Sequence, residues 1–182
     1  MASNPHFVAD NNAKKRDGDT HRIQPRGLDI IWGNDPRYWR VPTADDPRAM
    51  EGRDAPLELL QVCWLEVTGS MKLQKFELRP GKYNISFRIS MKRDAFGWSG
   101  MPIYIMAKIG KKGKYIWRSA NLTSSDNEPF EIPEGEPLQI EVSPGSNEED
   151  EELHFGLYEV WKGRWKGGLQ IYEAIIRPEK AK

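Results

Sequence analysis

The sequence predicts an all-β fold, a two-sheet antiparallel β-sandwich of jelly-roll-like type that follows a disordered N-terminal arm. Two observations lead to this prediction. Short apolar runs recur along most of the 182 residues, and clusters of Gly, Pro, Asn and Asp separate them. No segment keeps the spacing of three and four residues that a long amphipathic helix needs. Strands of this number and spacing are typical of sandwiches and jelly rolls.

Composition divides the chain into an arm and one domain. Residues 1–26 are rich in Asn, Lys, Arg and Asp with almost no apolar content, so we expect them to be disordered. Residues 27–182 are numerous enough to bury a core without a metal or disulfide staple. Cys63 is the only cysteine, which excludes an internal disulfide. The chain shows no secretory signal and no apolar run near the ~20 residues of a membrane span, so a cytoplasmic protein is expected.

The stretch from Leu28 to Pro42, LDIIWGNDPRYWRVP, places two tryptophans on either side of a turn. The segment GNDP at 33–36 consists of residues that each favour a turn. Trp32 is therefore expected to end a strand, and Trp39 to lie beyond the turn as the more exposed of the two. Two indoles beside a rigid turn could form a stacking surface or could pack in the core, and both possibilities remain open.

The later strands follow from alternation and turn signals. In chain order they are expected at 57–68, 83–91, 103–109, 115–118, 138–142, 152–161 and 169–177. The first of them carries apolar residues on both faces, which is typical of a central strand and makes Cys63 a core thiol. A hairpin tip is expected at 111–114. The acidic loop at 143–151 lacks the ligand spacing of a calcium site and is expected to be solvated.

The net charge of zero hides an uneven distribution. From Lys72 to Arg118 there are twelve Lys or Arg residues and two acids, whereas from Ser119 to Val160 there are twelve acids and no Lys or Arg. These stretches could form neighbouring strands that neutralise each other. They could instead give the molecule one basic face, which would favour nucleic acid.

Catalytic chemistry is not supported by the residues present. Two of the three histidines, His6 and His21, lie in the arm, and the third cannot make a triad or a zinc site alone. Glu152 and Glu159 would lie about 23 Å apart along one strand at 3.3 Å per residue, too far for a glycosidase pair. We therefore expect no enzyme, no cofactor and no metal. Sugar binding fits better, because aromatic rings pack against the apolar faces of sugars and carboxylates accept hydrogen bonds from hydroxyl groups.

The seven tryptophans divide by their neighbours in sequence. Those beside Gly, Pro or Lys in turn-rich segments are expected to be exposed, and they are Trp32, Trp39, Trp98 and Trp165. Those inside apolar runs are expected to be core residues, and they are Trp64, Trp117 and Trp161.

Four segments in this order resemble the plant phloem protein 2, or Nictaba-like, family, and among its members the cucurbit phloem lectins most. They are LDIIWGNDPRYWRVP, LLQVCWLEVTG, PGKYNISFRI and WKGGLQIYEAIIRP, which together span the chain from about Leu28 to Pro178. The resemblance implies a non-catalytic β-sandwich lectin for N-acetylglucosamine oligomers, such as chitooligosaccharides, and for N-glycan cores. It also implies a homodimer that passes from companion cells into phloem sap, with a role in defence or signalling.

The resemblance also implies which residues bind the sugar. The two ligand-associated tryptophans of the family fall on Trp32 and Trp39, and its two cleft carboxylates fall on Glu152 and Glu159. Trp165 and Lys166 complete the candidate set. Two alternatives without a role in sugar binding stay open, since Glu159 could simply pair with a lysine and Glu152 could end the acidic loop.

Two other functions remain as alternatives. Family members are reported to bind RNA, and the basic segment 72–118 could make this chain an RNA carrier of the phloem. A structural role is the third possibility, in which Cys63 cross-links the chain to a phloem filament protein.

Overall fold

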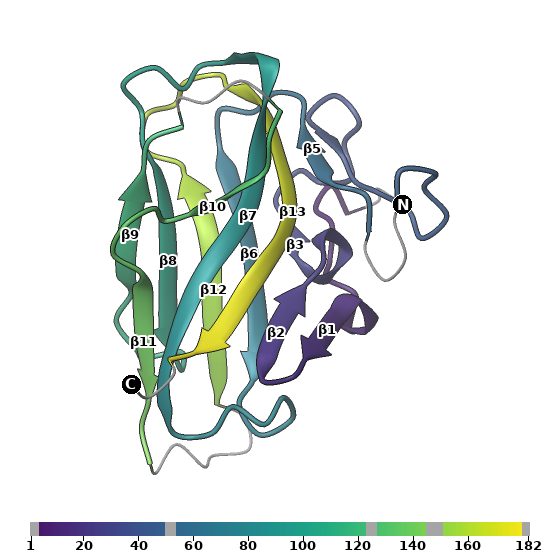
Figure 1. Cartoon of the computed structure of the whole chain (residues 1–182). Helices are drawn as coiled ribbons and strands as arrows, with labels where there is room; N and C mark the ends of the chain where they lie inside the picture. Colours follow the sequence, from purple (N-terminus) through teal and green to yellow (C-terminus); the bar gives the residue numbers. More distant parts are fainter. Residues whose placement is uncertain (1–3, 50–53, 123–126, 145–150, 180–182) are drawn as a thin grey trace.

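The computed structural model describes residues 4–49, 54–122, 127–144 and 151–179. In these ranges the chain forms two antiparallel sheets that pack face to face (Figure 1). The described residues of the larger sheet make β1 (Lys14–Asp17), β2 (Thr20–Ile23), β13 (Gly167–Pro178), β5 (Leu57–Leu59) and β4 (Trp39–Arg40), together with β7 (Gly81–Phe96), β10 (Phe130–Ile132) and β11 (Leu138–Val142). Those of the smaller sheet make, in spatial order, β3 (Asp29–Ile30), β6 (Leu65–Lys72), β12 (Glu152–Glu159), β8 (Ile103–Ile109) and β9 (Ile116–Ala120). Two 3-10 turns are η1 (Asn11–Ala13) and η2 (Pro25–Gly27). The predicted all-β antiparallel sandwich is confirmed.

Alternating burial on the strands builds the core between the sheets. On β6, Leu65 and Val67 are fully buried, and Glu66 between them is partly exposed on the outer face. Gly69 lies opposite Phe155 of β12, and a Cβ at Gly69 would come within 2.4 Å of the phenyl ring. The missing side chain thus makes room for Phe155, whose ring centroid lies 6.2 Å from that of Phe87 on β7. Rings from the two sheets meet in the middle of the sandwich.

The described part of the expected disordered arm is ordered, which corrects that expectation for residues 4–26. β1 and β2 form a hairpin, and β2 pairs with β13 through Ile23 opposite Ala174. Ile23 is fully buried, and Arg22 forms an ion pair with Glu173 of β13. The arm has few apolar residues, but it needs few, because main-chain hydrogen bonds to an existing strand supply its contacts.

The expected strand at 57–68 is two shorter strands, β5 and β6, which belong to different sheets. Between them, Val62 makes an isolated bridge with Lys166. The interruption allows one apolar run to serve both sheets, which explains its apolar residues on both faces. The hairpin expected around 111–114 is present, with β8 and β9 paired on either side of it.

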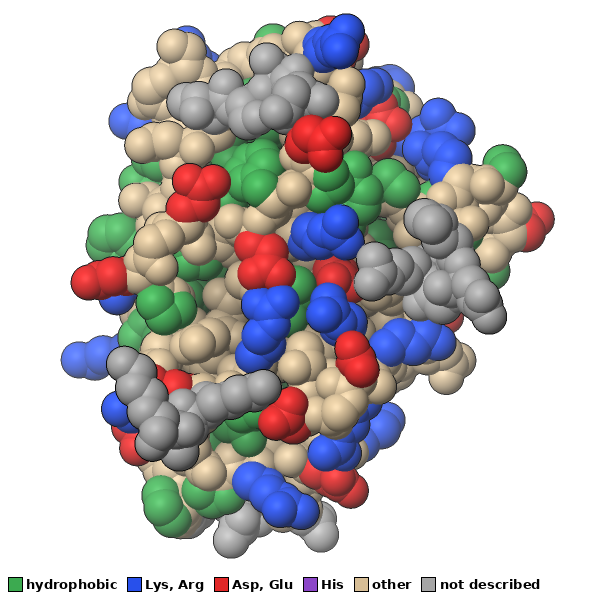
Figure 2. All heavy atoms as spheres, in the orientation of Figure 1, with side chains coloured by type: hydrophobic (Ala, Val, Ile, Leu, Met, Phe, Trp, Pro, Cys, Tyr) green, Lys and Arg blue, Asp and Glu red, His purple; other side chains and the backbone are tan. Residues whose placement is uncertain are grey.

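Basic and acidic segments lie on neighbouring strands. Lys82 of β7 lies opposite Glu141 of β11, and Arg88 of β7 lies opposite Glu131 of β10. On the face seen in Figure 2, Lys and Arg side chains alternate with Asp and Glu side chains. These pairings favour mutual neutralisation over a single basic face. Residues 145–150 of the expected acidic loop lie outside the described residues.

Candidate functional site

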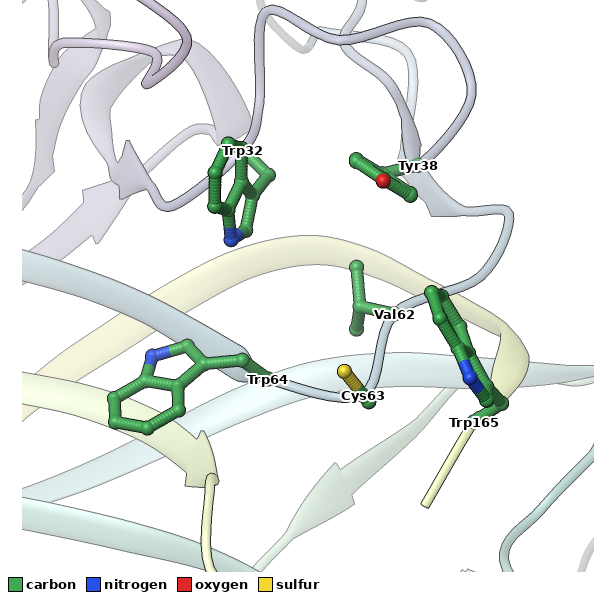
Figure 3. A pocket seen from close by; sticks show the side chains of 6 residues that line it. All are labelled: Trp32, Tyr38, Val62, Cys63, Trp64 and Trp165. Atoms are coloured by element: carbon green, nitrogen blue, oxygen red, sulfur yellow. The ribbon is translucent and has the colours of Figure 1, made fainter. Parts of the chain in front are cut away.

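Six side chains enclose an open cavity of about 280 Å³ beyond the ends of β3, β6 and β13. This aromatic cavity is lined by Trp32, Tyr38, Val62, Cys63, Trp64 and Trp165. Figure 3 shows Trp32 and Tyr38 across from Val62 and Cys63, with Trp64 and Trp165 on opposite flanks. The three indoles are 40%, 46% and 51% exposed, in sequence order. Large apolar rings left open to solvent around a concavity are typical of a ligand site.

Trp32 owes its position to an unusual backbone conformation. Its φ is 66°, a left-handed value that bulky side chains rarely adopt. The backbone N–H of Trp32 donates to Nδ1 of His6 at 2.9 Å, and the imidazole packs edge-on against the indole with centroids 5.2 Å apart. Gly33 allows the turn to close against Phe7, because a Cβ there would come within 2.7 Å of that side chain. The N-terminal segment therefore holds Trp32 in its strained position.

Tyr38 connects the two sides of the aromatic cavity. Its ring centroid lies 6.1 Å from that of Trp32 at a steep angle, and 6.3 Å from that of Trp165 at an interplanar angle of 31°. The guanidinium of Arg37 covers Tyr38 at 5.1 Å and forms an ion pair with Asp35. The rings thus support one another and present a continuous aromatic wall.

Trp39 is buried, with 2% of its surface exposed, so the prediction that it is the more exposed of the pair is wrong. It begins β4 opposite Leu59, and its indole N–H donates to the carbonyl of Ile31 at 3.1 Å. Side chains alternate along an extended segment, so the residue that faces the cavity is Tyr38. The hydrogen bond from Trp39 to Ile31 holds the two ends of the turn together.

Glu159 and Lys166 lie buried directly behind the cavity wall. The Nζ atom of Lys166 is 3.5 Å from Oε1 of Glu159, and it donates to the carbonyls of Cys63 and Arg164 at 3.1 Å each. Both side chains are at most 1% exposed. Burial lowers the pKa of Lys166, and the charge of Glu159 opposes that shift. The alternative in which Glu159 pairs with a lysine is therefore present in the structure.

Glu159 also organises the β12–β13 loop (160–166). Its two carboxylate oxygens accept hydrogen bonds from the backbone N–H groups of Trp161 and Lys162, at 3.3 and 3.4 Å. Lys166 meanwhile holds Cys63, one of the cavity residues, through its carbonyl. The buried pair thus joins the loop that carries Trp165 to the segment that carries Val62 and Cys63.

Glu152 lies at the other end of β12, opposite Lys72 on β6. Glu152 and Glu159 are seven positions apart, which corresponds to about 23 Å of extended chain. Nε2 of His154 lies 3.8 Å from Oε2 of Glu152, and this contact is an ion pair only when the imidazole is protonated. The structure therefore brings Trp32, Trp165, Glu159 and Lys166 together around the cavity and leaves Glu152 outside it.

Five of the seven tryptophans, Trp39 among them, are not where the sequence predicts. Trp98 is buried and donates to the carbonyl of Gly167, whereas the expected core residues Trp64, Trp117 and Trp161 are 46%, 56% and 59% exposed. Expectations for Trp32 and Trp165 agree with the structure. The exposure of Trp64 could have been predicted from the sequence. Side chains two residues apart on a strand point to the same face, and Glu66, two residues after Trp64, is on the outer face.

Cys63 is partly exposed and lines the cavity, so the expectation of a core thiol is corrected. Across the described ranges, no helix has the length and apolarity needed to cross a membrane. Within those same ranges, no group of three or more His, Cys, Asp or Glu residues is positioned to hold a metal ion.

The chain is similar in sequence to known plant proteins. A family model described as "Phloem protein 2" matches residues 18–178. The chain is 45% identical over 164 residues to Phloem protein 2-like A9 of Arabidopsis thaliana, covering 85% of this chain and 84% of that protein. It is 30% identical over 98 residues to a lectin of Luffa acutangula, covering 53% of this chain and 44% of the lectin. The solved insecticidal crystal protein Cry2Aa matches with a TM-score of 0.47 at 13% identity, over 89% of this chain and 22% of that one.

Proposed function

Because the chain belongs to the phloem protein 2 family, we propose that it is a lectin and that the aromatic cavity is its sugar site. The observation that carries the proposal is the group of three solvent-exposed indoles and one phenol around a single concavity. The proposed ligands are N-acetylglucosamine oligomers and N-glycan cores, bound without catalysis. The proposed setting is phloem sap, where a homodimer would gain avidity for multivalent glycans.

The chemistry of the cavity suits an N-acetylated sugar. Aromatic rings pack against the apolar C–H face of a pyranose, and Trp165 with Tyr38 offers two rings inclined by only 31°. Val62 and Cys63 supply an apolar wall for an acetamido methyl group. A cavity of about 280 Å³ is at the small end of ligand pockets, which run from about 300 to 1,000 Å³. It therefore holds a short segment of an oligomer.

The other candidate residues receive supporting roles in this proposal. Trp39 fixes the turn between Trp32 and Tyr38, and the pair formed by Glu159 and Lys166 fixes the walls. Glu152 is left without a part in the cavity because it lies at the far end of β12.

Calorimetry with chitotriose tests the assignment. Trp165→Ala should weaken binding by about ten-fold or more, because a lost stacking contact is worth about 0.5–1.5 kcal/mol in addition to its buried area. Phe96→Ala removes an aromatic ring of similar exposure, 46%, that does not line the cavity, and should bind like the wild type. No heat with the wild-type protein would sink the lectin proposal. Unchanged affinity in a folded Trp165→Ala variant would move the site elsewhere.

Cys63 offers a direct test of where the sugar binds. It is the only cysteine of the chain and lines the cavity, so its alkylation by iodoacetamide reports on this site alone. Saturating chitotriose should slow the alkylation several-fold, whereas maltotriose should not. A sugar that binds in calorimetry but leaves the alkylation rate unchanged would show that the cavity is not the site.

A further inference from the structure

A second group of exposed aromatic side chains lies on the outer face of the five-stranded sheet. It lines a pocket of about 350 Å³ formed by Tyr104, Met106, Trp117 and Trp161, which we call the sheet pocket. Trp117 and Trp161 are 56% and 59% exposed, more than any tryptophan of the aromatic cavity. Neither the proposed sugar site nor the packing of the core makes use of these two indoles.

The strand pattern places these side chains outside the sandwich. On β8, Tyr104 and Met106 alternate with buried residues of the core. Met106 lies directly opposite Trp117 of β9, and the Tyr104 ring centroid is 5.7 Å from that of Trp117. Trp161, from the β12–β13 loop, meets the same tyrosine at 5.0 Å. Three rings from three segments therefore converge on one outward-facing pocket.

The sheet pocket is close to the aromatic cavity by two routes. Trp161 and Trp165 belong to the same loop, and four residues of extended chain span at most about 14 Å. Across the sheet, Glu66 of β6 pairs with Tyr158 of β12, which pairs with Tyr104 of β8. Neighbouring strands are about 4.8 Å apart, so β8 lies about 10 Å from β6, the strand that follows Trp64 of the aromatic cavity. The exposed indoles of the two sites therefore lie near one another.

Hydrogen-bonding groups lie among these rings. The carboxylate of Glu66 accepts the indole N–H of Trp64 at 3.2 Å. Burial and the neighbouring Tyr115, which shares a hydrogen bond with it, raise the pKa of Tyr158, so its hydroxyl keeps its proton at neutral pH. Rings separated by hydroxyl and carboxylate groups match a linear oligosaccharide, whose sugar units have apolar faces and hydroxyl edges.

We propose that the sheet pocket binds the continuation of the same oligosaccharide chain whose end occupies the aromatic cavity. This inference rests on the proposed lectin function and extends it, because it makes the protein selective for glycan length. A chain of two sugars would fill only the cavity. A longer chain would also stack on Trp161 and Trp117.

Calorimetry with chitobiose and chitohexaose tests the proposal. In the wild-type protein the hexamer should bind about ten-fold or more tightly than the dimer, since it adds ring contacts. In Trp117→Ala/Trp161→Ala this ratio should fall to about two or less, with chitobiose affinity unchanged. Arg118→Ala, which alters an exposed neighbour on β9, is the matched control and should keep the full ratio.

The outcomes separate the two proposals. If neither saccharide binds the wild-type protein, the lectin proposal fails and this inference fails with it. If chitobiose binds but the length ratio survives in Trp117→Ala/Trp161→Ala, only the second site is overturned. Sedimentation equilibrium adds a further check. A change in oligomer mass with an unchanged length ratio would make the sheet pocket an interface between copies of the chain, which also overturns the inference.

Discussion

Lys166 connects three segments of the chain through a single ammonium group. It contacts the carboxylate of Glu159 on β12, the carbonyl of Cys63 before β6 and the carbonyl of Arg164 in its own loop. An ammonium with no exposed surface is stable only when its charge and its hydrogen-bond donors are satisfied. Its partners here are all fixed in place, which makes Lys166 a rigid support for the aromatic cavity.

Lys166→Met keeps the length of the side chain and removes its charge, leaving the carboxylate of Glu159 buried without its partner. Breaking a buried ion pair from one side costs about 3–5 kcal/mol, so urea unfolding should show a loss of stability of about 3 kcal/mol. Lys162→Met makes the same change at an exposed position of the same loop and should change stability by less than about 0.5 kcal/mol. Equal stabilities of the two variants would contradict the structural role of the pair.

The sequence could predict the exposure of only some of the side chains at the site. The turn-formers after Trp32 and the polar neighbours of Trp165 correctly indicated exposure. The opposite faces of Tyr38 and Trp39 depend on the pairing of β4 with β5, a contact between segments almost twenty residues apart. Local propensity carries no information about such a partner, so it could not reveal which of two adjacent aromatic side chains is buried.

The polar composition of the N-terminal residues gave no indication of the β1–β2 hairpin. It packs on β13 through a few buried side chains, among them His21 at 4% exposure, whose ring contacts Phe76 edge-on at 6.4 Å. Burial first, and then the charge of Arg16, lower the pKa of His21, whereas Asp19 and Glu77 oppose the shift. The neutral imidazole is therefore the form that fits the folded hairpin.

Acid should weaken this hairpin. Because the pKa of His21 is lowered in the folded protein, the unfolded chain takes up the proton first, near its ordinary value of about 6.5. Stability should therefore fall as the pH drops from 7 to 5, and His21→Phe should lose less stability over that interval than the wild type. Urea unfolding at both pH values measures the difference. His154, whose pKa burial also lowers, is present in both proteins, so it does not affect the comparison. Parallel losses in the two proteins would refute a role for His21.

Long strands with alternating burial and Gly-containing hairpin tips could be predicted from the sequence, and the β8–β9 hairpin is an example. The break between β5 and β6 was not readable, because one apolar run feeds two different sheets. The order of residues 14–23 was missed for a related reason. Its strands depend on hydrogen bonds to β13, more than 140 residues later, rather than on their own composition.

At the scale of the whole molecule, charge is balanced strand by strand. Glu131 lies opposite Arg88 and also forms an ion pair with Arg177 at 2.7 Å, which lowers the pKa of Glu131. Lys82 lies opposite Glu141. An RNA carrier would instead need cations free to contact phosphates. Strand pairing thus gives the RNA-binding alternative less support than the uneven sequence suggested.

Removing the carboxylate charges of β10 and β11 should free the Lys and Arg side chains opposite them to contact phosphates. Wild-type protein is expected to bind single-stranded RNA weakly, with little dependence on salt. Glu131→Gln/Glu141→Gln should bind more tightly, and each released cation that contacts a phosphate adds about 0.7 to the slope of log K against log salt. Fluorescence anisotropy across a salt series measures both quantities. Asp19→Asn/Asp45→Asn changes the net charge equally without touching these strands and should not steepen the slope. Tight, salt-sensitive binding by the wild type would restore the carrier hypothesis.

The position of β13 has a consequence for how the protein is made in the cell. This strand pairs with β7, β2 and β5, all of which precede it in the chain and so leave the ribosome before it. Until then the N-terminal hairpin has no strand to pair with, and one side of β7 is open along its length. Contacts of such long sequence separation also form slowly. The larger sheet therefore closes only after β13 has been synthesised, and a nascent chain halted before residue 167 presents unpaired strand edges to chaperones or to other nascent chains.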